Sequence, residues 1–578
     1  MARSIMSPGL LEIRAARQEM NGTLIAVLVF SVLVNVLMLT GPLYMLQVYD
    51  RVLGSQSEAT LVALTVLITF LFVAMGFLDH ARARIMARIG ARIQEKLDRR
   101  VFAASLRRLT LAPNDQAALA AQRDLEAIQR LWASPVLLAL FDIPWTPMFI
   151  GAIFIFHPWM GWLAILGGII LVGVTLLNQR NTEQPLQRAS GAAMTAERFA
   201  ENVKAESEVI AALGMQSNGF DRWRSLRGEA MGQAIAAADM GGMFSGITKT
   251  FRMFLQSAIL GLGAWLVLRG ELSAGAMIAG SILMGRALAP IEQSIGQWAV
   301  VTRAREGTAR LADLLSRVPA EPERTALPRP KALLEAQNLT VVPPGEQQAV
   351  LRMVSFRLEP GQALGVIGPS GSGKSTLARA LIGVWRPAGG KVRLDGATLD
   401  QYDPDVLGSY IGYLPQRVSL FDGTIAENIA RLSPEPDPAL VVEAAKKAAA
   451  HDMILKLPDG YDTRVASIGG RLSGGQVQRI GLARALYGDP VILILDEPNS
   501  NLDNDGSVAL NLAIRAMKEA GRAILIMAHR PAAIQECDLL LVMEEGTRKA
   551  FGPRDQVLRD MVKNHTEIVR STGPGGVA

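Results

Sequence analysis

Hydrophobic positions gather in the first 300 residues of the chain, in runs long enough to cross a membrane. About 20 apolar residues in a helix, at a rise of 1.5 Å each, span the roughly 30 Å hydrocarbon core of a bilayer. The pattern predicts six such spans, at 24–46, 60–78, 134–155, 159–178, 253–268 and 274–293. The third span contains three prolines, so we expect it to be kinked. This half of the chain is predicted to be an α-helical polytopic membrane domain.

Polar connections between the spans predict helical arms. The segments 80–133 and 179–246 have helical periodicity and few breakers. Breakers do occur at 111–115 and 213–219, where Gly, Pro, Asn and Asp collect and predict turns. We therefore expect the membrane helices to continue beyond the bilayer as antiparallel arms, with turns placed to dock on another domain.

The pattern changes after about residue 300, where the density of hydrophobic residues falls. Residues 317–332 are proline-rich and predict a linker. Beyond them, short β-rich runs alternate with helical patterns, which indicates an α/β domain with a largely parallel sheet. The predicted division is a membrane domain at 1–316, a linker at 317–332 and an α/β domain at 333–578.

Composition agrees with this division. Of the 578 residues, 50% are hydrophobic and only 19% are charged, against about 25% charged in ordinary soluble domains, so several soluble domains and disorder are both excluded. The single cysteine, Cys537, cannot form an intrachain disulfide and indicates a reducing compartment for its domain. The first span is too long for a cleaved signal peptide, and we expect none.

The net charge of +6 indicates which side of the membrane the polar segments face, and not a nucleic-acid partner. Residues 80–133 hold eleven Lys and Arg against five acids, next to a membrane span. Positive charge of this kind faces the cytoplasm, which predicts cytoplasmic termini and arms in contact with membrane lipids, and no binding of nucleic acid. The arginines from Arg82 to Arg100 are expected to form a solvated helix face.

Two charged residues, Asp142 and Arg286, fall inside the predicted spans. Charges there are costly unless they are paired or face water. One hypothesis is that the two residues pair with each other or line a conduit. The alternative is that they are interfacial residues whose charged ends reach the polar boundary.

The most specific motif is a glycine-rich loop between a strand-like run, ALGVI, and a helix-like run, TLARALIG. Its glycines let backbone N–H groups surround a phosphate, and its lysine neutralises phosphate oxygens. The serine after the lysine is expected to bind Mg²⁺. The motif consists of Gly368, Pro369, Ser370, Gly371, Ser372, Gly373, Lys374, Ser375 and Thr376.

Two further motifs accompany the loop. In VILILDEP, a buried strand ends at Asp496, which is predicted to reach the Mg²⁺ shell, and Glu497 is predicted to polarise the attacking water. The second motif opens a helix-like run and predicts another anion-binding surface, with an ordinary capped helix N-terminus as the alternative. It consists of Leu472, Ser473, Gly474, Gly475 and Gln476.

Together these motifs resemble those of ATP-binding-cassette (ABC) transporters of the exporter type, with the membrane half fused to the cassette. The resemblance implies ATP and Mg²⁺ as ligands and a homodimer in which two subunits enclose each ATP. It also implies that Gln416 senses Mg²⁺, that His529 contacts the γ-phosphate and that Asp503 lies across the dimer. A strand-end histidine without this role is the alternative for His529. The implied metal ligands are Ser375, Gln416 and Asp496.

Three segments narrow the resemblance: DEPNSNLD, GRALAPIEQ (285–293) and FDIPWTPMF (141–149). They resemble the inner-membrane ATPases of bacterial type I secretion, in the branch that exports proteases and lipases. The resemblance implies a polypeptide substrate with a C-terminal signal, a periplasmic adaptor protein and an outer-membrane channel. We expect no peptidase domain before the first span. The alternative function is export of a lipid or a small amphipathic molecule.

The chain departs from the family pattern at two places. The stretch expected to offer an aromatic ring to adenine has none, and Val342 or Pro343 offers only an apolar face, which leaves ATP and GTP both as candidates. Ser467 stands near the place where exporters commonly carry a glutamate that touches the coupling region.

Overall fold

The computed structural model describes residues 7–322, 324–465, 472–500, 504–528 and 534–560. The chain forms two compact units: a helical unit of Met1–Leu109 and Pro113–Ala320, and an α/β unit of Thr110–Ala112 and Glu321–Ala578. The combination of a helical membrane domain and an α/β domain is the predicted fold class.

Among the described residues of the helical unit, six helices are long and apolar enough to cross a membrane, as predicted. The first is segmented into α2 (Asn21–Leu37), α3 (Thr40–Gln47), the π-helix η1 (Val48–Val52) and α4 (Leu53–Ser55). The others are α5 (Glu58–Leu111), the pair α7 (Pro135–Asp142) and α8 (Thr146–Phe156), α9 (Pro158–Ala205), α11 (Gln216–Leu268) and α12 (Ala274–Gly296). Shorter helices complete the unit: α1 (Pro8–Gln18), α6 (Gln116–Ala133), α10 (Ser207–Ala212) and α13 (Trp298–Arg317).

The third span is interrupted, which confirms the predicted kink. It consists of α7 (Pro135–Asp142), a 3₁₀ turn (Ile143–Trp145) and α8 (Thr146–Phe156). Each piece has one of the three prolines in its first turn. A proline has no N–H to donate within a helix interior. In the first turn of a helix the N–H groups have no helical partner, so proline is tolerated there and each proline starts a new piece.

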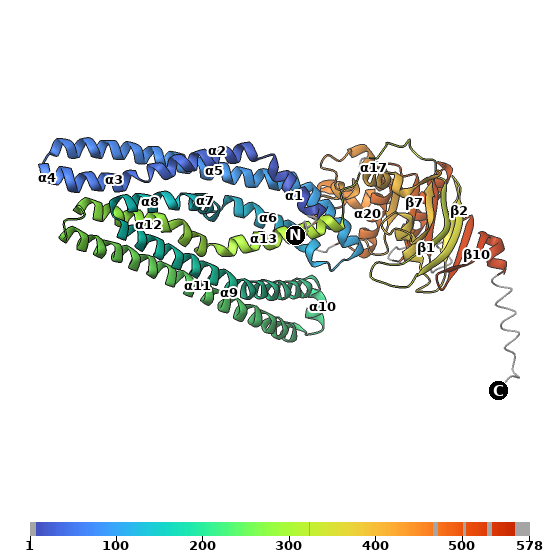
Figure 1. Ribbon diagram of the computed structural model, residues 1–578. Coiled ribbons are helices and arrows are strands. Elements are labelled where there is room, and N and C mark those ends of the chain that lie inside the picture. Colours follow the sequence, from blue (N-terminus) through green and yellow to red (C-terminus); the bar gives the residue numbers. More distant parts are fainter. Residues whose placement is uncertain (1–6, 323, 466–471, 501–503, 529–533, 561–578) are drawn as a thin grey trace, which may run out of the picture. The chain divides into compact units, whose positions relative to one another are not determined.

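The predicted arms are continuations of the membrane helices. Helix α5 runs for 54 residues, α9 for 48 and α11 for 53. Helices α9 and α11 lie side by side along their lengths (Figure 1). At the first arm turn, the Asp115 carboxylate accepts hydrogen bonds from the amides of Ala117 and Ala118 at 3.1 and 3.2 Å and so caps α6.

Three short turns lie at the end of the helical unit opposite the arm turns. We call them the distal turns; they are 56–57, 157 and 269–273. Exposed tryptophans stand near them. Trp159 and Trp162 are 64% and 60% exposed, and the Arg269 guanidinium lies over the Trp265 ring at 3.9 Å. Tryptophans of this kind mark the level of the lipid headgroups, so they indicate one boundary of the membrane.

The hypothesis that Asp142 pairs with Arg286 is wrong. The carboxylate of Asp142 binds the guanidinium of Arg82, with Oδ1 2.7 Å from Nη1 and Oδ2 3.0 Å from Nη2, whereas Arg286 is exposed. The expectation of a solvated arginine face also fails at this position, because Arg82 is buried. Arg82, four residues after the second predicted span, therefore supplies the counter-charge for Asp142 in the kinked third span.

The described part of the α/β unit contains two sheets. The larger has the order β10–β9–β3–β8–β7–β6, and all its neighbours are parallel except β10 with β9. The predicted, largely parallel sheet is therefore present. Its strands are β3 (Ala363–Ile367), β6 (Ile411–Leu414), β7 (Ile492–Asp496), β8 (Ala523–Ala528), β9 (Leu539–Glu544) and β10 (Thr547–Pro553). The smaller antiparallel sheet consists of β2 (Leu351–Leu358), β1 (Leu334–Val341), β4 (Gly389–Leu394) and β5 (Ala397–Thr398).

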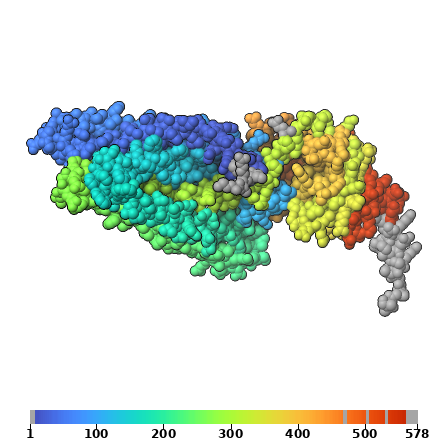
Figure 2. Space-filling view, in the orientation of Figure 1, coloured from blue at the N-terminus to red at the C-terminus, as the bar shows by residue number. Residues whose placement is uncertain are grey.

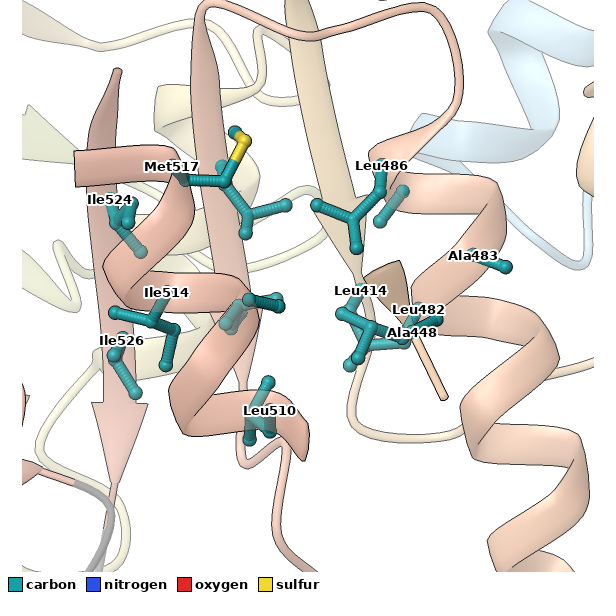
Figure 3. Packing of buried hydrophobic residues seen from close by; sticks show 14 of the residues in the cluster. Leu414, Ala448, Leu482, Ala483, Leu486, Leu510, Ile514, Met517, Ile524 and Ile526 are labelled. Atoms are coloured by element: carbon teal, nitrogen blue, oxygen red, sulfur yellow. The ribbon is translucent and has the colours of Figure 1, made fainter. Parts of the chain in front are cut away.

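Helices pack on both faces of the larger sheet. Alternate residues of β8 enter different cores: Ile524 and Ile526 face one, and Leu525 and Met527 the other. Figure 3 shows the first of these cores, where α20 and α21 meet the sheet. The helices of this unit are α14 (Lys374–Leu381), α15 (Pro404–Tyr410), α16 (Ile425–Ile429), α17 (Pro438–Lys447), α18 (His451–Leu455), α20 (Gly474–Leu486) and α21 (Asn504–Glu519).

Candidate active site

The predicted chemical groups meet at the carboxyl edge of the parallel sheet. In register, Ile367 of β3 lies opposite Ala528 of β8, and Asp496 of β7 lies opposite Met527. The glycine-rich loop follows β3, the acid pair ends β7, and Gln416 stands two residues after β6. Carboxyl ends of parallel strands form the usual ligand crevice of open α/β sheets. His529, which follows β8 directly, and Asp503 lie outside the described residues.

Glycine conformation shapes the loop at 368–373. Gly371 and Gly373 have φ of +81° and +94°, a region that side chains other than glycine rarely occupy. A Cβ on Gly373 would also lie 2.7 Å from Leu351 Cδ2. The loop then leads directly into the N-terminus of α14, so its backbone N–H groups and the helix dipole favour the same anion.

Lys374 lies folded across the loop. Its Nζ donates hydrogen bonds to the carbonyl oxygens of Gly368 and Pro369 at 2.8 and 2.9 Å. Burial lowers the pKa of the Lys374 ammonium, while the carboxylates of Glu497 and Asp496 oppose this effect. An ammonium in this position can exchange its carbonyl partners for phosphate oxygens without moving far.

Asp496 is buried, and burial raises the pKa of its carboxyl group above the ordinary value. A hydrogen bond from the Ser375 side chain partly opposes the shift, and the charge of Glu497 adds to it. The hydroxyl of Ser375 and the carboxylate of Asp496 are therefore in contact. Hard oxygen donors of this kind suit Mg²⁺, so the residues present fit the metal that the resemblance implies.

Hydrogen bonds fix both the backbone and the side chain of Glu497. Its φ is +52°, which is uncommon outside glycine and is typical of functional turns. Its amide donates to the Met527 carbonyl at 3.0 Å, and its Oε2 accepts a hydrogen bond from Gln416 Nε2 at 3.0 Å. The structure thus brings together Lys374, Ser375, Gln416, Asp496 and Glu497.

The motif at 472–476 is a capped helix start. Gln476 N donates to Ser473 Oγ at 3.3 Å, and Ser473 N donates to Gln476 Oε1 at 2.8 Å, which is a capping box. Ser473 and Gly474 are exposed. Within the part of the chain that the structure describes, no hydrogen bond joins these residues to the glycine-rich loop of the same chain. The helix start at Ser473 and Gly474 is therefore an exposed surface of the cassette.

One site residue was missed in the sequence. Gln478 of α20 is buried, and its Nε2 donates to the carbonyl of Pro498, next to Glu497, at 2.6 Å. The signal was present: Gln478, Gly481, Leu482 and Ala485 recur at helical spacing on the buried face of α20. A glutamine on such a face needs a hydrogen-bond partner, which the sequence does not name.

Comparison with known proteins agrees with this architecture. A family model described as "ABC transporter transmembrane region" matches residues 24–289, and one described as "ABC transporter" matches residues 351–500. Over 549 residues the chain is 43% identical to the type I secretion system ATP-binding protein PrsD of Rhizobium meliloti (strain 1021), covering 95% of this chain and 94% of that protein. The chain belongs to the ABC transporters of type I secretion systems.

Two more distant similarities also extend over most of the chain. The Toxin RTX-I translocation ATP-binding protein of Actinobacillus pleuropneumoniae is 29% identical over 551 residues, which cover 93% of this chain and 76% of that protein. A solved structure of a bacterial Atm1-family ABC exporter with ATP bound superposes with a TM-score of 0.78 at 23% identity, covering 96% of this chain and 99% of that one. The last comparison concerns the fold alone.

The family assignment states the activity in general terms. The protein is a multi-pass membrane protein whose cassette binds ATP and couples its hydrolysis to transport. The matched region 351–500 contains the glycine-rich loop, Gln416, the motif at 472–476 and the acid pair.

Proposed function

We propose that the protein is the ATP-driven component of a type I secretion system and exports a polypeptide across the bacterial inner membrane. The observation that carries the proposal is the near full-length similarity to PrsD at 43% identity. The exported polypeptide carries a C-terminal signal, and a periplasmic adaptor and an outer-membrane channel continue its path.

The chain acts as a homodimer in this proposal. The exposed face of Ser473 and Gly474 in one protomer closes over an ATP held by the glycine-rich loop of its partner. The amides of the loop and the Lys374 ammonium bind the phosphates, so the negative charge that develops during hydrolysis meets donors already in place. Val342 and Pro343 offer the base only an apolar face, and GTP is an alternative nucleotide.

Three residues would hold Mg²⁺: Ser375, Asp496 and Gln416. The ion, when bound, supplies positive charge beside the β- and γ-phosphates. Glu497 orients the attacking water and receives its proton. Gln416 Nε2 donates a hydrogen bond to the Glu497 carboxylate, and a Gln416 side chain drawn to Mg²⁺ would leave this carboxylate to the water. His529 contacts the γ-phosphate, and Asp503 lies across the dimer.

Charge and aromatic positions support the membrane topology of this proposal. The arms and both termini lie in the cytoplasm, where the basic residues of 80–133 adjoin anionic lipid. The distal turns, with Trp159, Trp162 and Trp265 near them, then lie at the periplasmic boundary. This arrangement puts the cassettes on the side where ATP is available.

Secretion profiling tests the proposal. We compare culture supernatants from a strain with the wild-type chain, a strain that lacks it and a strain with Glu497→Gln, which binds ATP but turns it over at least about 100-fold more slowly. One or a few polypeptides are expected to disappear from the last two supernatants together. Unchanged supernatant proteins with an altered lipid or small-molecule content would replace polypeptide export by the alternative function.

A further inference from the structure

One exposed face of α5 changes from apolar to basic where the helix leaves its apolar run. Val73 and Phe77 on this face are 68% and 73% exposed. Arg84 and Arg88, also exposed, lie seven and eleven residues after Phe77, and at about 100° per residue both point within about 20° of its direction around the helix. Figures 1 and 2 show the hairpin from α2 to α5, in blue, along one side of the helical unit. An exposed apolar face of a membrane helix contacts acyl chains, so the arginines beyond it lie at the level of the lipid headgroups.

These arginines have no protein partner in the part of the chain that the structure describes. Neither Arg84 nor Arg88 takes part in a hydrogen bond or an ion pair there, and neither does Arg92, which is exposed one turn further along α5. The nearby Arg82 differs, because it is buried and binds an oxygen of each of two aspartates at 2.7 Å. The three exposed arginines therefore present uncompensated positive charge over about two helical turns.

Helix α2 shows that apolar surface continues to the level of these arginines. The Arg82 guanidinium donates to Ser31 Oγ at 3.3 Å, which sets α5 and the antiparallel α2 level with each other at these two residues. Leu28 and Ile25, three and six residues before Ser31, are 52% and 64% exposed. At a rise of about 1.5 Å per residue in both helices, they lie level with the segment 84–88. An arginine beside the apolar layer of a membrane is costly unless an anion pairs with it.

We propose that Arg84 and Arg88 bind the phosphate of an anionic phospholipid, with Arg92 adding positive charge beside it. The two guanidinium groups are one turn apart, about 6 Å along the helix, so both can donate hydrogen bonds to one phosphate. The acyl chains lie along Phe77 and Val73, which a free phosphate would leave uncovered. A zwitterionic lipid carries its own cation, which competes with the arginines. The inference goes beyond the proposed function, because binding of this lipid involves no exported molecule.

Native mass spectrometry of the purified full-length chain in detergent tests the site. Phosphatidylglycerol is the probe, and the dissociation constant of its tightest bound molecule is measured. Each arginine is expected to tighten this binding about fivefold, so Arg84→Gln combined with Arg88→Gln is expected to weaken it about 25-fold. Phosphatidylcholine is expected to bind the wild-type chain at least about tenfold more weakly. Inorganic phosphate at the same concentration is expected to leave the bound phosphatidylglycerol in place.

Two further variants separate recognition of the lipid from net charge and from folding. Arg84→Lys combined with Arg88→Lys keeps both charges but loses the forked donors, and its affinity for phosphatidylglycerol is expected to stay within about fivefold of the wild type. Arg99→Gln combined with Arg224→Gln removes the same charge at exposed positions of the arms, far beyond the predicted spans. This control is expected to bind phosphatidylglycerol within about twofold of the wild type, because charges beyond the Debye length are screened.

Wild-type affinity for phosphatidylglycerol in the variant with Arg84→Gln and Arg88→Gln would overturn the proposal. An equal loss in the variant with Arg99→Gln and Arg224→Gln would also overturn it, since general charge attraction would then explain the binding. Equal affinity for phosphatidylcholine would exclude recognition of an anionic headgroup, and displacement by inorganic phosphate would assign the arginines to a free anion. None of these measurements involves export, so a failed lipid site leaves the proposed function standing.

Discussion

Opposite charges are buried side by side at the carboxyl edge of the sheet. Burial lowers the pKa of Lys374 and raises that of Asp496, so each group is shifted toward its neutral form. Strained and shifted groups of this kind gather at functional sites, where ligand binding offsets their cost. These two groups therefore make the cassette less stable than its packing alone would allow.

Replacing Asp496 measures the unfolding free energy that the buried carboxylate costs. Because the folded pKa is raised, the native state holds more protons than the unfolded state between the ordinary value of 3.8 and the raised value, and stability falls as pH rises through that window. Asp496→Asn is expected to raise the melting temperature without nucleotide at pH 7.5, by about 2–4 °C for each kcal/mol removed, while abolishing ATPase activity. Thermal denaturation with and without Mg-ATP measures both effects. The exposed Asp555→Asn serves as a control, and a lower melting temperature for Asp496→Asn would contradict the argument.

The bond from Gln478 to Pro498 connects α20 to the turn that holds Glu497. Gln478→Leu keeps much of the volume but leaves the Pro498 carbonyl without its donor, which costs about 1–3 kcal/mol of unfolding free energy. We expect kcat for ATP to fall several-fold with little change in KM, since the turn and not the phosphate loop is disturbed. Gln535→Leu, at an exposed position, is the matched control. An unchanged kcat would show that the bond does not position Glu497.

Individual elements begin where a side chain or a proline satisfies the helix terminus. Prolines start the pieces of the third span, Asp115 caps α6, and the capping box of Ser473 and Gln476 starts α20. Ser473 can both cap α20 and contact ATP. Its hydroxyl accepts the capping hydrogen bond from the Gln476 amide, while the helix start at Ser473 and Gly474 stays exposed. The two roles are separable by substitution.

Ser473→Asp separates them. Asp caps a helix about as well as Ser, so the unfolding free energy is expected to stay within about 0.5 kcal/mol of the wild type. The added carboxylate would face the γ-phosphate of the partner's ATP, and ATPase activity is expected to fall at least about 100-fold. Ser473→Ala gives the reverse comparison, with a loss of about 1 kcal/mol for the missing cap. Wild-type ATPase activity in Ser473→Asp would leave only the capping role.

The whole molecule has one cassette per chain. The proposed homodimer brings the glycine-rich loop of one subunit to the exposed helix start at 473–474 of the other. Each site then combines the loop of one protomer with Ser473 of its partner. Two inactive chains with different lesions should therefore complement each other.

Mixing Lys374→Ala chains with Ser473→Asp chains provides the measurement. The mixed dimer has one site with both parts intact, so ATPase activity is expected to exceed the sum of the two separate preparations severalfold. A chain that carries both substitutions, mixed with Lys374→Ala, forms no intact site and is the control. Activity no higher than that control would place each site within a single chain.

Local patterns were sufficient for the elements of this fold. The apolar runs located all six spans, the prolines located the break in the third, and the alternation after residue 332 indicated the parallel sheet. Length and period are properties of neighbouring residues, and burial in lipid or in a sheet acts on them directly. The glycine-rich loop was recognisable for the same reason, since its backbone conformation depends on glycines within six positions.

The pairing of residues that are distant in the sequence depends on how the elements pack. Asp142 lies 60 residues from Arg82 and 144 from Arg286, and sequence distance favoured neither. Likewise, Gln416 meets Glu497 and Gln478 meets Pro498 because strand order and helix packing bring them to one edge. The charge of these groups and their place in apolar segments already indicated in the sequence that they need a partner. Which group supplies it depends on angles and distances that arise only when the helices pack.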